Sequence, residues 1–142
     1  MQPVLYMHAA ATLFMTGLIW FVQVVHYPLF GRVGSGYEAY QAEHMRRTGL
    51  VVGPPMLLEA AAGGWIAWFP PPGVSTGLAL GGLGLLFVIW ISTWLAQMPN
   101  HQRLLQGFDK RAHRKLVLSN WVRTVAWTLR SFLALWMVVA AS

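Results

Sequence analysis

The sequence predicts an all-α integral membrane protein, an antiparallel four-helix bundle with both termini outside. Of its 142 residues, 56% are hydrophobic and only 10% are charged, whereas soluble domains carry about 25% charged residues. Four apolar segments have the length of a membrane span, which is ~20 residues. They are Val4–Phe30, Leu50–Phe69, Thr76–Met98 and Leu116–Ala140. Because the connections between them are short, we expect residues 1–142 to form a single domain.

The lysine and arginine residues outside these segments predict the orientation. The first and third connections are basic, whereas the N-terminus, the turn at Pro70–Gly73 and the C-terminus contain no lysine or arginine. By the positive-inside rule, both termini lie outside. The net charge of +6 is explained by this basic rim, which faces lipid headgroups, so no nucleic-acid partner is expected. We expect a bacterial-type plasma membrane protein, and leave open whether it forms a homo-oligomer.

The first segment is expected to remain as a helix, because it lacks a basic start and is too long for the core of a signal peptide. His8 and His26 are separated by five turns of ~3.6 residues and therefore lie on one face. His26 is placed near the inner end of the span, beside Tyr27.

The second helix is expected to begin near Gly36 and to be long, extending well before its membrane segment. Pro54 and Pro55 fall within the span and predict a kink, which frees backbone carbonyls. Glu59 follows and is the only acidic residue in any of the four segments. It is either the structural partner of an arginine or a functional carboxylate, and the sequence does not decide between these.

In the third helix, Gly77 and Gly81 have the spacing of close helix packing, so the outer half is interpreted as scaffold. The inner end is more polar and leads to His101 at the membrane boundary. His113, in the basic connection that follows, is expected to be a solvated loop residue.

The fourth helix has a polar stripe, because Asn120, Arg123, Trp127 and Arg130 recur at steps of three and four residues. An arginine near the bilayer centre costs ~2.5–3.5 kcal/mol, so these side chains should face the bundle interior and have partners there. Counting ~1.5 Å per residue from the inner boundary places Arg123 roughly 10 Å deep and Glu59 roughly 13 Å deep. We therefore expect these two to pair. The same count places Arg130 near the level of His8.

Three histidines from three helices lie near the inner end and predict a cofactor or metal site. Imidazole suits iron, copper, zinc and haem, all of which are found in helical bundles. The predicted ligands are His26, His101 and His44. We expect Glu59, Arg123 and Asn120 to act in catalysis, with Asn120 also behind the histidines, and Tyr27, Trp127 and Arg130 to contact the substrate. The cofactor is unknown, and a cofactor-free enzyme stays open.

Two short motifs resemble those of a known family. The run Pro99-Asn-His-Gln-Arg-Leu104, a basic connection and Asn120-Trp-Val-Arg-Thr124 are similar to the small four-helix membrane proteins grouped with the anthrone oxygenases. The resemblance covers mainly residues 99–130. It implies oxidation of a hydrophobic, aromatic or phenolic substrate by oxygen, with Asn120 and Arg123 matching the last-helix motif. His101 stands where a plainer polar residue is expected, which leaves room for a metal-dependent variant.

The sequence thus supports an oxygenase-like oxidoreductase embedded in the membrane that takes a lipophilic substrate from the bilayer. The alternative is a small proton- or anion-coupled transporter or channel that uses Glu59 and Arg123. A third interpretation is an assembly partner whose buried charges only fix the helix register.

Overall fold

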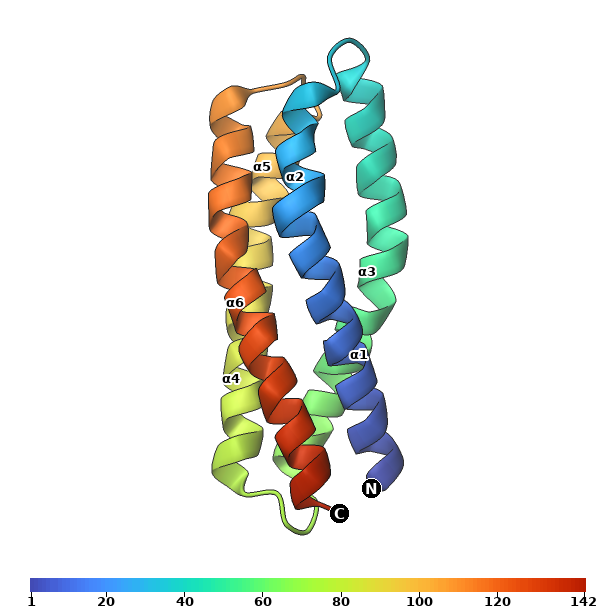
Figure 1. Ribbon diagram of the computed structural model, residues 1–142, viewed down its shortest axis with the longest axis vertical. Helices are drawn as coiled ribbons and strands as arrows, with labels where there is room; N and C mark the ends of the chain where they lie inside the picture. The colour runs from blue at the N-terminus through green and yellow to red at the C-terminus, as the bar shows by residue number, and fades with distance from the viewer.

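The computed structural model describes residues 1–142 and consists of helices joined by short turns (Figure 1). Four helical stretches are long and apolar enough to cross a membrane, and the two termini lie at the same end of the bundle. These stretches are Gln2–Arg32, Tyr37–Trp68, Thr76–Leu104 and Lys110–Ala140. The predicted all-α four-helix membrane bundle is confirmed.

The first and third stretches are each interrupted by one π turn. The first comprises α1 (Gln2–Phe21), the π turn η1 (Val22–His26), α2 (Tyr27–Leu29) and the 3₁₀ turn η2 (Phe30–Arg32), and the third comprises α4 (Thr76–Ser92), the π turn η3 (Thr93–Gln97) and α5 (Met98–Leu104). Each π turn ends two residues before a proline, Pro28 or Pro99. A proline has no amide hydrogen and clashes with the carbonyl four residues earlier, and the wider turn relieves this conflict.

The π turns help to position side chains near the end of the bundle opposite the termini (Figure 1), which is called the inner end below. A π turn holds more residues than an α turn, so the side chains after it are rotated relative to those of an uninterrupted α-helix. Tyr27 follows η1, and His101 follows η3. Both side chains are buried inside the bundle rather than facing lipid.

The second and fourth stretches are the single helices α3 (Tyr37–Trp68) and α6 (Lys110–Ala140). As predicted, α3 begins after Gly36, whose φ of 85° is a left-handed conformation that glycine adopts easily. Pro54 and Pro55 both lie inside α3, and the helix changes direction along its length (Figure 1).

The inner ends of α5 and α6 are joined through Asp109. Its carboxylate accepts hydrogen bonds from the backbone amides of Arg111 and Ala112 and from the Arg103 side chain. The bond from the Ala112 amide and then that from Arg103 hold the pKa of Asp109 below its usual range. The cap therefore contributes stability above the unfolded pKa of about 3.9 and loses it as the pH falls through the lower folded value.

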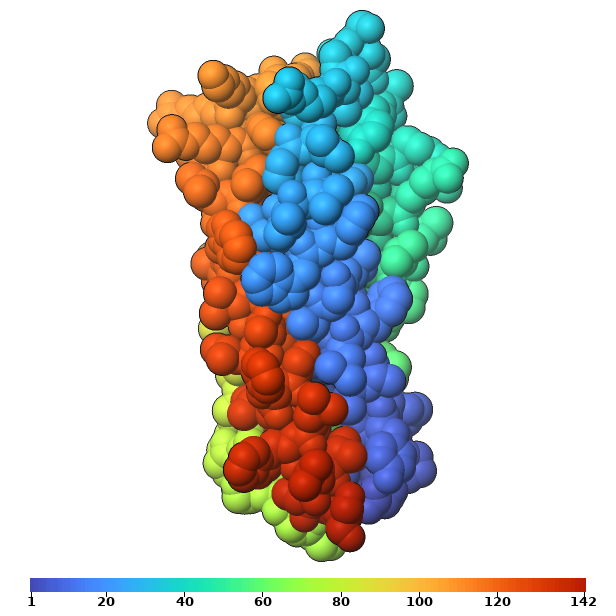
Figure 2. Space-filling model, in the orientation of Figure 1, coloured from blue at the N-terminus to red at the C-terminus, as the bar shows by residue number.

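In the packed bundle, α1 and α6 lie side by side along the face seen in Figure 2. Apolar side chains such as Met15 and Trp127 pack between the two helices and are almost completely buried. Large apolar side chains also cover the outside, including Phe87, Phe132 and Trp136, each of them more than 60% exposed. An apolar outer surface of this extent matches a lipid environment, so the chain is an integral membrane protein.

The predicted orientation can be tested by cysteine labelling, because the chain has no native cysteine. Gly73 is unsuitable, since its φ is 85° and an added Cβ would collide with the Ala140 carbonyl. We therefore choose Pro72→Cys and Gln106→Cys, both at exposed positions. In intact cells, a membrane-impermeant maleimide should label position 72 and not position 106. Equal labelling of both would contradict the arrangement, and labelling of only position 106 would invert it.

Candidate functional site

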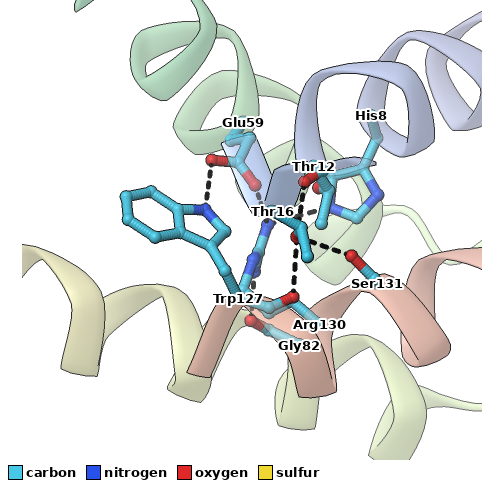
Figure 3. Close-up of polar contacts among 8 residues, drawn as sticks. All are labelled: His8, Thr12, Thr16, Glu59, Gly82, Trp127, Arg130 and Ser131. Carbon is cyan, nitrogen blue, oxygen red and sulfur yellow. Dashed lines mark hydrogen bonds and ion pairs between the residues drawn. The ribbon is translucent and has the colours of Figure 1, made fainter. Parts of the chain in front are cut away.

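A buried ion pair occupies the half of the bundle nearer the termini (Figure 3). Arg130 Nη2 lies 3.3 Å from Glu59 Oε1, and Trp127 Nε1 donates to Glu59 Oε2 at 3.0 Å. Arg130 also donates to the Gly82 carbonyl and lies 3.1 Å from His8 Nε2. The Glu59 and Arg130 side chains are 0% and 1% exposed. The predicted shared level of Arg130 and His8 is therefore confirmed.

The predicted Glu59–Arg123 pair is wrong, because Glu59 pairs with Arg130 instead. The depth count took Leu50 as the inner boundary of the second helix. In the structure, however, His44 already lies among the inner-end histidines. Glu59 is consequently farther from the inner end than the count indicated. Its partner on α6 is two turns farther along, a shift of about 10 Å at ~1.5 Å per residue.

A chain of hydrogen bonds orients His101 at the inner end of the bundle. Tyr37 donates to Gln41 Oε1 at 3.3 Å, and Gln41 Nε2 lies 2.9 Å from His101 Nδ1. Since the Gln41 amide nitrogen can only donate, His101 Nδ1 accepts and Nε2 carries the proton. His101 Nε2 therefore donates to the Tyr27 hydroxyl, 2.9 Å away, and the proton of Tyr27 remains available to a ligand.

His113 holds the backbone of Tyr27, a member of this hydrogen-bond chain. It is not the solvated loop residue predicted from the sequence. It lies on α6 and is partly buried, with Nε2 2.7 Å from the Tyr27 carbonyl oxygen, to which it donates. The prediction failed because α6 begins before the apolar segment, at Lys110 rather than Leu116. The basic residues of the third connection therefore lie partly on a helical extension.

The other two predicted histidines form a direct pair. His26 Nε2 lies 2.9 Å from His44 Nδ1, and the Thr48 hydroxyl lies 3.1 Å from the same nitrogen. The rings of His44 and His101 are 5.3 Å apart, so the structure does gather the three predicted histidines. His44 Nε2 has no hydrogen-bond partner in the protein, and the His44 side chain lines a cavity.

The gathered histidines are not arranged as the predicted three-histidine metal site. No group of three histidine, aspartate or glutamate side chains is arranged to hold a metal ion. Both ring nitrogens of His101 are engaged, by Tyr27 and Gln41, and His26 is bonded to His44. The arrangement is instead a histidine pair beside a Tyr–His–Gln chain, which suits proton transfer and hydrogen-bond donation.

Arg123 is a buried cation without an acidic partner. It is 6% exposed and forms no ion pair, and its Nε makes no hydrogen bond. Its Nη1 donates to Asn120 Oδ1 at 3.3 Å, Asn120 Nδ2 donates to Gln23 Oε1 at 2.9 Å, and the guanidinium carbon lies 5.1 Å from the centre of the Trp127 ring. Asn120 thus positions Arg123. The prediction that it lies behind the histidines is wrong. The guanidinium retains donor capacity for a ligand.

Arg123, Tyr27, His44 and His101 all line one cavity of about 360 Å³. Its walls come from the stretch from α1 to α2, the inner half of α3, the stretch from α4 to α5, and α6, and they are mostly apolar. Apolar lining residues include Met15, Ile19, Val52, Met56, Trp90 and Met98. Two further lining residues, Leu57 and Trp94, are 64% and 63% exposed on the outside of the bundle. The cavity therefore reaches the lipid-facing surface between α3 and η3.

The predicted site residues fall into three groups. Four line the cavity, two support these from behind, and three belong to the ion-pair centre. The first group is Tyr27, His44, His101 and Arg123, the second is His26 and Asn120, and the third is Glu59, Trp127 and Arg130. The structure therefore separates Glu59, Trp127 and Arg130 from the cavity, although Trp127 contacts both Glu59 and the Arg123 guanidinium.

Two glutamines were missed by sequence reasoning. Gln23 and Gln41 are 3% and 0% exposed and hold Asn120 and His101 respectively. Each lies three residues before a histidine, His26 or His44, on the same face of its helix. That spacing was the available signal, because a buried amide in a membrane bundle needs a polar partner.

Comparison of this chain with known protein families, curated proteins and solved structures finds no match.

Proposed function

We propose that this chain is an oxidoreductase of a bacterial-type plasma membrane that uses O₂ to oxidise a lipophilic aromatic or phenolic substrate. The main support is the cavity of about 360 Å³, whose apolar walls end in a phenol, two imidazoles and an unpaired guanidinium. Small-molecule sites have this construction, with apolar walls and a few convergent polar groups. The resemblance of residues 99–130 to the anthrone oxygenase group points to the same chemistry.

The first step that these residues support is removal of a proton from the substrate. Anthrone is a suitable type of substrate, because its enol form is a lipophilic phenol and its methylene carbon is acidic. With His44 protonated at Nδ1, the free Nε2 is the base, and Nδ1 donates to His26 Nε2, 2.9 Å away. The proton leaves through His26, which is only partly buried. Arg123 stabilises the substrate oxyanion, assisted by the Tyr27 hydroxyl.

The second step is the reaction of the anion with O₂. The deprotonated carbon forms a bond to one oxygen atom, and the resulting peroxide takes up a proton. Loss of water then leaves a carbonyl at that carbon. Each methylene converted gives four electrons, consumes one O₂ and releases one water, so no other oxidant is needed. The apolar walls suit this step, because O₂ and the substrate are both more soluble in hydrocarbon than in water.

The transporter alternative uses Glu59 and Arg123. Glu59 is paired with Arg130 and does not line the cavity that contains Arg123. The Trp127 ring is the link between them, and it separates Glu59 from Arg123 rather than forming a shared polar path. We therefore favour oxidation and assign the Glu59–Arg130 pair a structural role.

The proposal is tested with anthrone as the probe and the purified protein in nanodiscs. Wild-type protein should consume one O₂ per anthraquinone formed, faster than protein-free nanodiscs. Arg123→Gln should lower the rate by about 10²–10³, the usual effect of removing an oxyanion donor. Arg46→Gln is the matched control, because Arg46 is exposed at the inner end and bonds only Glu43, and its rate should equal that of the wild type. A wild-type rate no higher than the background, with anthrone and with related phenols, would overturn the proposal.

A further inference from the structure

Two glycines on α3 leave part of the cavity wall without side chains. Gly49 and Gly53 line the cavity, and a Cβ added to either would meet no atom within 4 Å. Neither glycine is therefore needed for close helix packing, the usual reason for glycine in a membrane bundle. Glycine is also unfavourable inside a helix. Because both positions lack a side chain, space stays open near Leu57 and Trp94, where the cavity reaches the lipid.

Arg123 provides the polar end of the same cavity. Its guanidinium is buried and lacks a carboxylate partner, and its Nε is unbonded. A buried charge without a counter-charge is costly in hydrocarbon. A ligand with an anionic oxygen would supply this counter-charge.

Building on the proposed function, we infer that the cavity binds its substrate as the anion of an acidic phenol or enol. The oxyanion lies on Arg123, and the apolar body lies along the Gly49–Gly53 face of α3. The substrate enters from the bilayer between α3 and η3. Two tryptophans, Trp90 and Trp94, also line the cavity and favour a flat aromatic body over a flexible alkyl chain.

Binding can be measured separately from oxidation with an alkylated 4-nitrophenol, whose ionised form is yellow, and its methyl ether. Both probes are titrated into nanodiscs of zwitterionic lipid, with tryptophan fluorescence reporting binding. The phenol should bind at least about tenfold more tightly than the ether, since it gains a charge-assisted hydrogen bond. Bound phenol should also be yellow at a pH at which it is colourless in protein-free nanodiscs. Arg123→Gln should remove both differences, whereas Arg46→Gln should retain them.

The glycine face is tested with Gly53→Leu, and with Gly49→Leu as a second variant. Gly64→Leu is the matched control, because Gly64 also lies on α3 with nothing within 4 Å of its Cβ but does not line the cavity. The leucines at positions 49 and 53 should weaken both probes by about tenfold or more, by filling the space that they use. Melting temperatures should stay at or above that of the wild type in all three variants. Normal binding in both cavity variants would overturn the placement of the apolar body along the Gly49–Gly53 face.

The inference and the proposed function fail in different ways. Equal affinity for phenol and ether in the wild type, or ionised probe bound to Arg123→Gln, would overturn the inference even if anthrone is oxidised. Tight binding of the phenolate without oxidation of anthrone would support the binding site and contradict the proposed oxidation by O₂.

Discussion

Replacing Glu59 by glutamine is expected to destabilise the folded protein by about 3–5 kcal/mol, because the buried Arg130 would lose its carboxylate partner. Both side chains are essentially inaccessible, at 0% and 1% exposure, so solvent cannot compensate for the loss. Arg130→Met should cost a similar amount, since Glu59 would then be the uncompensated charge. Reversible unfolding in mixed detergent micelles measures both changes.

The double variant Glu59→Gln with Arg130→Met should lose much less than the sum of the single changes, because neither charge remains unpaired. A matched cycle combines Glu59→Gln with Arg123→Gln. It should show a much smaller coupling, since Arg123 reaches this centre only through the Trp127 ring. A coupling energy as large for Arg123 as for Arg130 would contradict the pairing in the structure.

Replacing His44 by alanine is expected to lower kcat for anthrone by about 10²–10⁴, the usual contribution of a general base. His44 is the histidine that combines a free Nε2 at the cavity with a proton acceptor, His26, on its other nitrogen. Added imidazole should restore part of the rate by entering the space left by the ring. His26→Gln should have a smaller effect, because the base itself remains.

These changes are followed by O₂ uptake, with the melting temperature of each variant as a check on folding. A His44→Ala protein that melts like the wild type and turns over at the wild-type rate would exclude His44 as the base. Lost activity without imidazole rescue, together with a lowered melting temperature, would assign His44 a structural role instead.

The fold could be predicted from the sequence because it depends on average properties of long segments. Four apolar stretches and the basic residues between them are sufficient for four spans in one bundle. The two π turns were not predicted, since hydropathy does not report local helix geometry. Pro28 and Pro99 were their local signal, and each follows a π turn by two residues.

The charged pair could not be assigned from the sequence because pairing depends on the relative heights of two helices. An error of two turns in the boundary of α3 was enough to replace Arg130 by Arg123 as the expected partner of Glu59. The polar stripe of α6 was correctly placed inside the bundle. Its members, however, are shared between two centres that helical periodicity alone cannot separate.

The inner-end histidines were gathered as predicted, but they are not arranged as a three-histidine metal site. Spacing places the rings near one another, whereas ligation depends on where each ring nitrogen points. Gln41 and Tyr27 use both nitrogens of His101, and this requires side-chain geometry that the sequence does not contain. The cavity was also not predicted. Gly49 and Gly53 line it with open space beside them, and which face of α3 turns towards this space depends on how the helices pack.

The source of the oxygen atom in the product tests the central claim most directly. Anthrone is incubated with the protein under ¹⁸O₂, and the anthraquinone is analysed by mass spectrometry in short time courses. Wild-type protein should form singly labelled anthraquinone well above the protein-free rate, and both Arg123→Gln and His44→Ala should return it to near that background. Labelled product that forms equally fast with and without protein, or a new oxygen that comes from water, would contradict oxidation in this cavity.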